Sequence, residues 1–382
     1  MILDILNKDP FLIEQFSFLI NYPELIDFKI RSSYFRNKMK NKIKRNCNTR
    51  FKIKRNQILQ SSFVALSRMS KSELLNNFII EFEGEGGIDE NGLTREWFNE
   101  LSKEIFNQNY GLFDCSLSNL SYKPNSLSSI NPNHLEYFRF AGIFTARALI
   151  QGQCIDAHLT SSFLKQILHH EPILDDLQDI EPEIFNSLTY MINNDVEPLY
   201  LNFTITKEEL GVSKTIELKK DGENIPVTNE NKNEFIRLRY LYILTTTIEE
   251  QLDAFNRGFE SLISHDEIKF FKPDELDLLI CGIPNIDVAD FKNNMTYEVP
   301  YSKDSPVIIM FFNVIENWNN EQLAKLLLFM TGSSRVPTNG FREFCDMCGK
   351  PLIIASGGDS SKLPTAHTCF NMLCLPQYED EE

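Results

Sequence analysis

Near its carboxyl end the chain reads Lys362-Leu-Pro-Thr-Ala-His-Thr-Cys-Phe-Asn371. Pro364 disfavours regular helix, so we expect an extended backbone on which His367 and Cys369, two residues apart, point to the same side. A protonated imidazole or a ring of backbone donors beside a thiol favours the reactive thiolate. The stretch is therefore a candidate for a nucleophilic cysteine, although an isolated pair of this kind is more often a packed thiol and a hydrogen-bonded ring.

The composition indicates a folded protein of more than one domain. The 382 residues are 42% hydrophobic and 24% charged, and domains commonly contain about 150 residues. The net charge of −16 would repel a phosphate backbone, so nucleic acid is not an expected partner. No apolar run approaches the roughly 18 residues of a membrane span. Eight cysteines are too dilute for a disulfide scaffold, which predicts a reducing, cytoplasmic or nuclear location.

One segment departs from this acidic average. Residues 29–55 contain twelve lysines and arginines and no aspartate or glutamate, with aromatic and aliphatic residues between them. Such a segment can bind RNA or a membrane surface. The favoured interpretation is a solvated helix followed by a strand, with the apolar positions packed inward.

Periodicity predicts mainly helices with a few short strands. In the first part we expect a strand over 78–82 and helices over 89–106 and 134–150. Further on we expect helices over 160–169, 182–193 and 231–256, with strands over 200–205 and 214–218. The breaker pair in Leu278-Leu-Ile-Cys-Gly-Ile-Pro-Asn285 predicts a domain boundary.

After this boundary the pattern predicts a smaller α/β unit. Residues 307–318 are apolar enough for either a helix or a buried strand. Asn319 with Gln322 three residues later predicts the start of a helix. Short apolar runs between turn signals over residues 332–382 predict a small sheet.

The remaining cysteines suggest a weaker candidate for a metal site. In Cys345-Asp-Met-Cys-Gly349 we expect a turn with two thiols, and a zinc ion would need further ligands from His367, Cys369 or Cys374. A reversible disulfide is a second alternative. The favoured interpretation is two unligated thiols in a surface loop, so we predict no metal.

The run over 362–371 closely resembles the active-site signature of HECT-type ubiquitin-protein ligases. Other segments resemble landmarks of that family in the same order: Phe82-Glu-Gly-Glu-Gly-Gly-Ile-Asp-Glu-Asn-Gly-Leu-Thr-Arg-Glu-Trp-Phe98, Tyr137-Phe-Arg-Phe-Ala-Gly142, Ile225-Pro-Val-Thr-Asn-Glu-Asn231, Phe255-Asn-Arg-Gly-Phe259, Leu278-Leu-Ile-Cys-Gly282 and Thr331-Gly-Ser-Ser-Arg-Val-Pro337. The resemblance covers nearly the whole chain.

The resemblance implies an α+β fold with two lobes. A mostly helical N-lobe would occupy residues 1–281 and carry a small mixed subdomain, at about 175–221, that docks the ubiquitin-conjugating enzyme. A hinge at 282–284 would lead to an α/β C-lobe at 285–382. By similarity, an apolar groove for the conjugating enzyme would include Leu188, Ile192, Tyr200 and Phe203.

The resemblance also implies a reaction. Cys369 would accept ubiquitin from the conjugating enzyme as a thioester and transfer it to a lysine of a protein substrate, without a cofactor. His367 and Thr368 would support the cysteine. Arg335 lies in a loop that would face it and contact ubiquitin, and an ion pair with a C-lobe carboxylate is the structural alternative.

The chain ends thirteen residues after Cys369, sooner than most members of the family. From this we expect that thioester formation can survive while transfer to lysine is impaired. The alternative hypotheses are therefore a ligation-impaired relative that binds ubiquitin and the conjugating enzyme, and a zinc or redox thiol protein.

Overall fold

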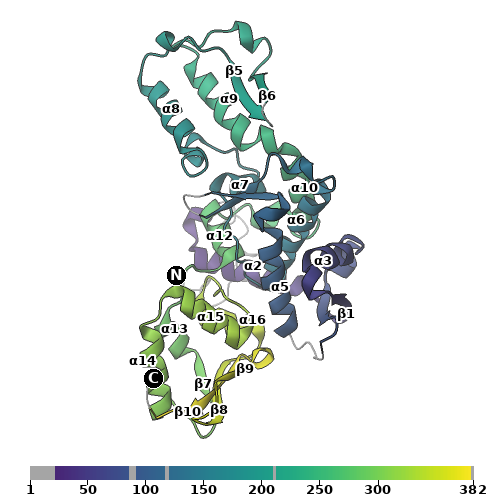
Figure 1. The fold of residues 1–382 in the computed structure, drawn as a ribbon, viewed down its shortest axis with the longest axis vertical. Helices are drawn as coiled ribbons and strands as arrows, with labels where there is room; N and C mark the ends of the chain where they lie inside the picture. The colour runs from purple at the N-terminus through teal and green to yellow at the C-terminus, as the bar shows by residue number, and fades with distance from the viewer. Residues whose placement is uncertain (1–21, 86–91, 117–119, 210–211, 380–382) are drawn as a thin grey trace.

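The computed structural model describes residues 22–85, 92–116, 120–209 and 212–379. Its buried apolar side chains form three clusters. We name the parts that hold them the central body (22–168 and 248–281), the outer subdomain (174–244) and the carboxyl-terminal unit (283–379). The central body lies between the other two (Figure 1). Within the described ranges, no helix is both long and apolar enough to cross a membrane.

The central body is mostly helical. Its elements are α2 (Phe28–Lys42), β1 (Lys44–Ile53), α3 (Ile58–Ser67), α4 (Lys71–Leu74), β2 (Asn76–Phe82), α5 (Gly92–Ile105), β3 (Phe113–Cys115), β4 (Tyr122–Pro124), α6 (His134–Gln151), α7 (Ser161–Ile167), α10 (Glu249–Glu260), α11 (His265–Ile268) and α12 (Pro273–Cys281). Helices α6 and α10 touch through Gly142 and Gly258, where a Cβ would collide with a carbonyl oxygen of the other helix. The missing side chains therefore set how closely the two central helices approach.

The basic segment 29–55 forms the predicted helix and strand, α2 and β1. The helix is not solvated as expected, because Arg31 and Arg36 are buried together with its apolar side chains. Strand β1 pairs in parallel with β2. Arg31 lies 2.5 Å from Glu275, and Lys42 lies 2.6 Å from Glu267. Carboxylates from distant parts of the chain thus neutralise much of this segment.

The outer subdomain contains α8 (Pro182–Asn193), β5 (Thr204–Glu209), β6 (Val212–Glu217) and α9 (Lys232–Leu244). Strands β5 and β6 form an antiparallel hairpin. The single helix predicted over 231–256 is wrong, because it breaks between α9 and α10 at Thr245, whose φ and ψ are −130° and −60°. Three consecutive β-branched threonines lower helix propensity there. The apolar cluster continues to Leu244, so α9 packs with the subdomain.

The carboxyl-terminal unit contains α13 (Val288–Asn293), β7 (Met295–Tyr297), α14 (Pro306–Glu316), α15 (Asn320–Thr331), α16 (Gly340–Cys348), β8 (Leu352–Asp359), β9 (Thr365–His367) and β10 (Met372–Gln377). Its sheet has the order β7-β8-β10-β9. The ambiguous run at 307–318 is a helix, α14. The predicted start of α15 is confirmed, since Asn319 and Gln322 form a capping box.

The surface loop predicted around Cys345 and Cys348 is wrong. Both residues lie in the last turn of α16, which ends at Cys348 and is capped by Gly349 with φ of 67°. The apolar side chains of α16 draw this helix into the core, where Phe341 and Phe344 are buried.

Candidate functional site

Cys369 lies in a turn at the edge of the carboxyl-terminal sheet. Strand β9 is followed by the 3-10 turn η11 (Thr368–Phe370) and by β10, which pairs antiparallel with β9. The extended backbone expected through Cys369 therefore ends at His367. The physical reason is Asn371, whose left-handed φ of 52° reverses the chain so that Met372 pairs with His367.

Asn371 fixes the conformation of this turn. Its side chain is fully buried, and its amide nitrogen donates to the carbonyl of Lys350 at 3.2 Å. Its own carbonyl accepts from the backbone of Ile353 at 2.9 Å. A buried amide with these partners holds the turn against β8.

Arg95 of α5 binds the same turn from the central body. The guanidinium donates to the Asn371 side-chain oxygen at 2.5 Å and to the Thr368 carbonyl at 2.6 Å. Arg95 is only 3% exposed. Because guanidinium hydrogen bonds are charge-assisted and desolvated here, Arg95 is a strong polar contact that positions the turn against the central body.

Gly92, the first residue of α5, makes room for the thiol. A Cβ at this position would lie 2.6 Å from Cys369 Sγ and 3.0 Å from Thr368 Oγ1. These separations are shorter than van der Waals contact. The absence of a side chain therefore lets the Cys369 turn pack on the helix.

Cys369 itself is half-buried. A lysine between α16 and β8, Lys350, binds its backbone. Lys350 Nζ donates to the Cys369 carbonyl at 2.9 Å and lies over the Phe370 ring. His367 is exposed. Among the residues that the structure describes, no hydrogen bond joins the His367 ring to Cys369.

Arg335 forms an ion pair across two parts of the molecule. Its Nε donates to Asp156 at 3.0 Å. Asp156 follows α6 in the central body, so the partner is not the C-lobe carboxylate considered from the sequence. The neighbouring Val336 pairs with Ile283, and the ion pair thus stabilises the junction beside residues 282–284.

The residues predicted for the docking groove divide into two kinds. Leu188 and Phe203 are 3% and 0% exposed and belong to the core of the outer subdomain, so they cannot line an open groove in this conformation. Ile192 is 42% exposed and Tyr200 is 91% exposed. Sequence reasoning missed two further exposed apolar residues, Tyr190 and Leu199.

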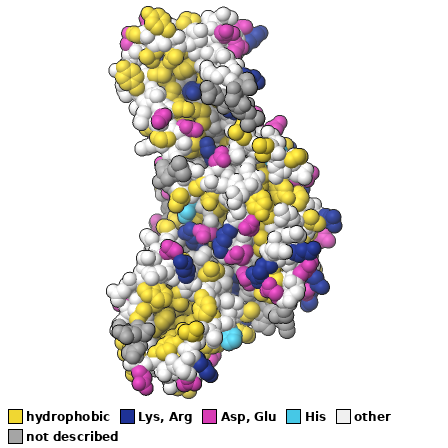
Figure 2. Space-filling view, viewed as in Figure 1, with side chains coloured by type: hydrophobic (Ala, Val, Ile, Leu, Met, Phe, Trp, Pro, Cys, Tyr) yellow, Lys and Arg dark blue, Asp and Glu magenta, His cyan; other side chains and the backbone are white. Residues whose placement is uncertain are grey.

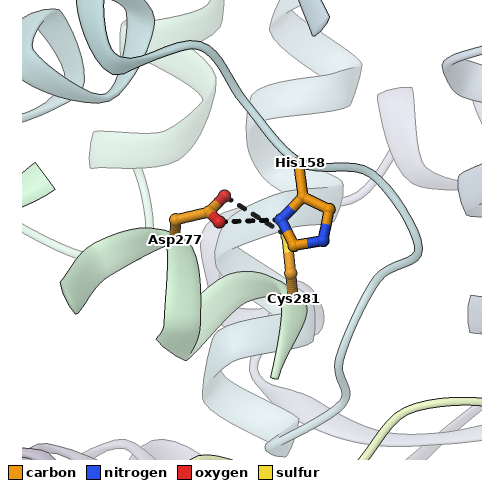
Figure 3. Close-up of side chains that lie close together, drawn as sticks. All are labelled: His158, Asp277 and Cys281. Carbon is orange, nitrogen blue, oxygen red and sulfur yellow. Dashed lines mark hydrogen bonds and ion pairs between the residues drawn. The ribbon is translucent and has the colours of Figure 1, made fainter. Parts of the chain in front are cut away.

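One group of possible metal ligands occurs in the described ranges: His158, Asp277 and Cys281 (Figure 3). Asp277 lies 2.8 Å from the His158 ring nitrogen. The Cys281 thiol donates to the Ala157 carbonyl at 3.1 Å. Burial and the nearby Asp277 raise the pKa of Cys281 well above its usual value. A neutral thiol with its own acceptor is typical of a structural hydrogen-bond network rather than a metal site.

The zinc site considered from the sequence, with Cys345 and Cys348 of α16, is not among the groups of possible metal ligands in the described ranges. Burial raises the pKa of the thiols of Cys345 and Cys348. Each thiol therefore forms the thiolate that would bind zinc less readily than an exposed cysteine does. None of the eight cysteines forms a disulfide.

Sequence reasoning missed the residues that hold the turn: Gly92, Arg95, Lys350 and Asn371. Gly92 and Arg95 lie in the landmark 82–98, and Asn371 ends the landmark 362–371. Their contact could not be inferred because it joins segments more than 270 residues apart.

The chain is similar in sequence to known proteins over most of its length. The sequence model of the HECT-domain (ubiquitin-transferase) family matches residues 99–382. E3 ubiquitin-protein ligase TOM1-like of Neurospora crassa is 36% identical over 376 residues, which are 96% of this chain and 9% of that protein. E3 ubiquitin-protein ligase RSP5 of Emericella nidulans is 39% identical over 360 residues, 93% of this chain and 44% of that protein.

A third relative is E3 ubiquitin-protein ligase Nedd-4 of Drosophila melanogaster, 39% identical over 357 residues, 92% of this chain and 36% of that protein. The chain thus spans less than half the length of these curated relatives. From its match to the family and its mixed helix and sheet structure, the chain belongs to the HECT-domain (ubiquitin-transferase) family.

Proposed function

We propose that this chain is the catalytic domain of a ubiquitin-protein ligase that carries ubiquitin as a thioester on Cys369. The observation that carries the proposal is the Cys369 turn: a half-buried thiol at a sheet edge, held by Asn371 and contacted by α5. Family membership supplies the substrate class. The comparisons do not favour the zinc, redox or ligation-impaired alternatives.

The proposed reaction has two acyl transfers. The Cys369 thiolate attacks the thioester carbonyl of the charged conjugating enzyme, and that enzyme's cysteine leaves as a thiolate. This exchange is nearly thermoneutral and depends on alignment. A substrate lysine amine then attacks, loses a proton, and expels the Cys369 thiolate. Neither step needs a cofactor.

The residues beside Cys369 have supporting parts in this proposal. The exposed His367 ring can reach an acyl group bound at the turn and accept or donate a proton. Thr368 acts through its carbonyl, which Arg95 binds at 2.6 Å, and through its hydroxyl near Gly92. Arg335 has its charge paired with Asp156, so we assign it to the junction rather than to ubiquitin.

We propose that the central body and outer subdomain form the N-lobe and that residues 285–382 form the C-lobe. The separate apolar clusters support this division. Residues 282–284 would be the hinge, since Gly282 has φ of 77° and Pro284 cannot continue α12. The outer subdomain and the carboxyl-terminal unit that contains β9 lie on opposite sides of the central body (Figure 1). Transfer would therefore require the C-lobe to turn about this hinge.

We propose that the conjugating enzyme docks on exposed apolar residues of the outer subdomain. This docking patch consists of Tyr190, Ile192, Leu199 and Tyr200, each at least 42% exposed. Figure 2 shows hydrophobic side chains gathered on this end of the molecule. Large exposed apolar side chains on one subdomain are typical of a partner surface, and Leu188 and Phe203 lie in the core beneath them.

A gel assay with activating enzyme, a panel of conjugating enzymes and ubiquitin tests the function. We expect an adduct that reductant removes, an oxyester resistant to reductant in Cys369→Ser, and no adduct in Cys369→Ala. Cys374→Ala is the matched control, because this half-buried thiol lies on β10 of the same sheet. Equal thioester formation by Cys369→Ala would refute the assignment.

Free ubiquitin chains or modification of the chain itself in the same assay would show transfer to lysine. An adduct without either product would support the ligation-impaired alternative. We further propose a cytoplasmic or nuclear location, which is consistent with eight free cysteines and can be checked by microscopy of the tagged protein.

A further inference from the structure

The basic segment 29–55 contains cations that form no ion pair with any carboxylate of the residues that the structure describes. Half of its twelve cations form ion pairs, namely Arg31, Arg36, Lys38, Lys42, Arg50 and Arg55. In the described part of the chain, Lys29, Lys40 and Arg45 have no carboxylate within ion-pair distance. These three share a location, because all of them line one cavity.

This cavity has a volume of about 800 Å³ and lies between α2 and β1 of the central body and α16 of the carboxyl-terminal unit. The cations that line it are Lys29, Arg36, Lys40, Arg45, Arg95 and Arg342. Its only lining carboxylates among the described residues are Glu343 and Asp346. The cavity is therefore strongly positive within a protein whose net charge is −16.

A positive lining is not a general property of cavities in this chain. Another cavity of about 740 Å³ lies beside α7 and α10. Four carboxylates line this second cavity, namely Glu171, Glu249, Asp253 and Glu260. The lining also contains one arginine, Arg257, and two histidines. The basic cavity thus gathers three of the six cations of segment 29–55 that form no ion pair with a described residue, whereas Lys44, Lys52 and Lys54 lie outside it.

Arg36 is an incompletely compensated charge in the wall of the basic cavity. The residue is 7% exposed. Its Nη2 donates to the Leu279 carbonyl at 2.8 Å, and its Nε lies 3.5 Å from Glu343. Its Nη1 is buried and has no hydrogen-bond partner among the described residues. A buried cation without full compensation is costly, and a nearby anion would offset that cost.

We propose that this cavity binds a small soluble polyphosphate that bridges the central body and the carboxyl-terminal unit. Several cations spread around one cavity match an anion with several charged groups, and arginine forks bind phosphate oxygens in pairs. Lys29 and Arg45 come from the body, and Arg342 comes from the other unit. The bound anion would hold the two parts together. This site is separate from the thioester chemistry of Cys369.

Titration calorimetry of the whole chain with inorganic tripolyphosphate tests the proposal, at a constant ionic strength of about 0.15 M to limit long-range attraction. The test variant is Lys29→Gln, Arg45→Gln and Arg342→Gln together. These residues are exposed, so the fold should persist. We expect their loss to weaken binding about tenfold or more.

The matched control is Lys52→Gln, Lys54→Gln and Lys303→Gln. These lysines are also exposed, and none of them lines the cavity. As in the test variant, two of them lie in the central body and one lies in the carboxyl-terminal unit. We expect the control to bind within about twofold of the original chain. Equal weakening in both variants would overturn the site, because it would indicate attraction to the surface as a whole.

Bridging gives a second measurement. Tripolyphosphate should slow hydrogen exchange in α16 of the original chain and leave it unchanged in Arg342→Gln. Absence of binding by the original chain, or tighter binding of a polyglutamate peptide than of tripolyphosphate, would overturn the proposal. Binding of the chain to vesicles that contain phosphoinositides, if tripolyphosphate does not compete with it, would also overturn the proposal. The ligand would then be a membrane lipid and not a soluble polyphosphate.

Discussion

Two cysteine–histidine groups in this chain contrast sharply. His367 and Cys369 are neighbours in sequence, yet in the described structure no hydrogen bond joins their side chains. His158 and Asp277 are 119 residues apart but lie within 2.8 Å, with Cys281 beside them. The first group is exposed or half-buried in a turn, whereas the Cys281 thiol is buried and donates to a carbonyl. Burial and hydrogen bonding, rather than sequence spacing, separate a proposed nucleophile from a structural thiol.

The largest expected difference between the two groups is in chemical reactivity. Burial raises the pKa of Cys281, and each unit of pKa lowers the thiolate fraction about tenfold. We therefore expect maleimide to label Cys369 at least about a hundredfold faster than Cys281 at pH 7.5. Mass spectrometry of each cysteine measures the rates, with the exposed Cys47 as the reference. Comparable rates at Cys281 and Cys369 would remove the contrast.

The next effect concerns how the Cys369 turn is held. Arg95→Ala would leave the buried Asn371 oxygen without its charged donor, at a cost of about 2–3 kcal/mol. We expect amides of η11 to exchange with solvent about a hundredfold faster. Arg55→Ala is the control, because its ion pairs with Glu85 and Glu96 are exposed and worth little. Unchanged exchange in Arg95→Ala would mean that the Arg95 hydrogen bonds do not hold the turn.

The docking patch gives the third effect. Tyr200→Asn with Ile192→Ala should weaken binding of the conjugating enzyme about thirtyfold, since exposed apolar anchors can contribute about 2 kcal/mol. Asparagine suits the left-handed φ of 50° at Tyr200. Leu188→Ala is the opposite case: this buried residue should lower unfolding free energy by about 2–5 kcal/mol. Binding assays and denaturant titrations separate the two outcomes, and a stability loss in the first variant would contradict the patch.

A smaller effect is expected for His367. His367→Ala should slow formation of the Cys369 thioester less than about tenfold, because general acid–base help is not needed for a thiolate exchange. The free energy of unfolding of this variant should change by no more than about 0.5 kcal/mol, since the His367 ring is exposed. Single-turnover charging and thermal unfolding measure both quantities. Complete loss of charging would make His367 an essential catalytic residue.

The last effect is a pH dependence of stability. The folded pKa of Cys281 lies above its unfolded value, so the stability from its neutral thiol is full below about pH 8.5 and falls as pH rises. The slope for one such thiol is about 1.4 kcal/mol per pH unit. Denaturant titrations at pH 7.5 and 9.5 should show a smaller loss in Cys281→Ala than in the original chain. Burial also raises the pKa of Cys154, to about 11, so part of the loss should remain.

Local signals predicted many elements of the fold. Helix α8 matches its predicted range, and the Asn319–Gln322 capping box marks the start of α15. Both depend on neighbouring residues only. The errors occur where distant packing or a backbone reversal decides: the break at Thr245, the helix at Cys345 and the turn at Asn371.

The sequence by itself determined the family, the position of the candidate nucleophile and the basic character of residues 29–55, because these are properties of short ordered motifs and of composition. Only the tertiary structure decided that Arg95 binds the turn of Cys369, that Leu188 is core while Tyr200 is exposed, and that Lys29, Lys40 and Arg45, which form no ion pair with a described residue, line one cavity. Each of these depends on contacts between segments far apart in the chain, which packing brings together and which no local pattern specifies.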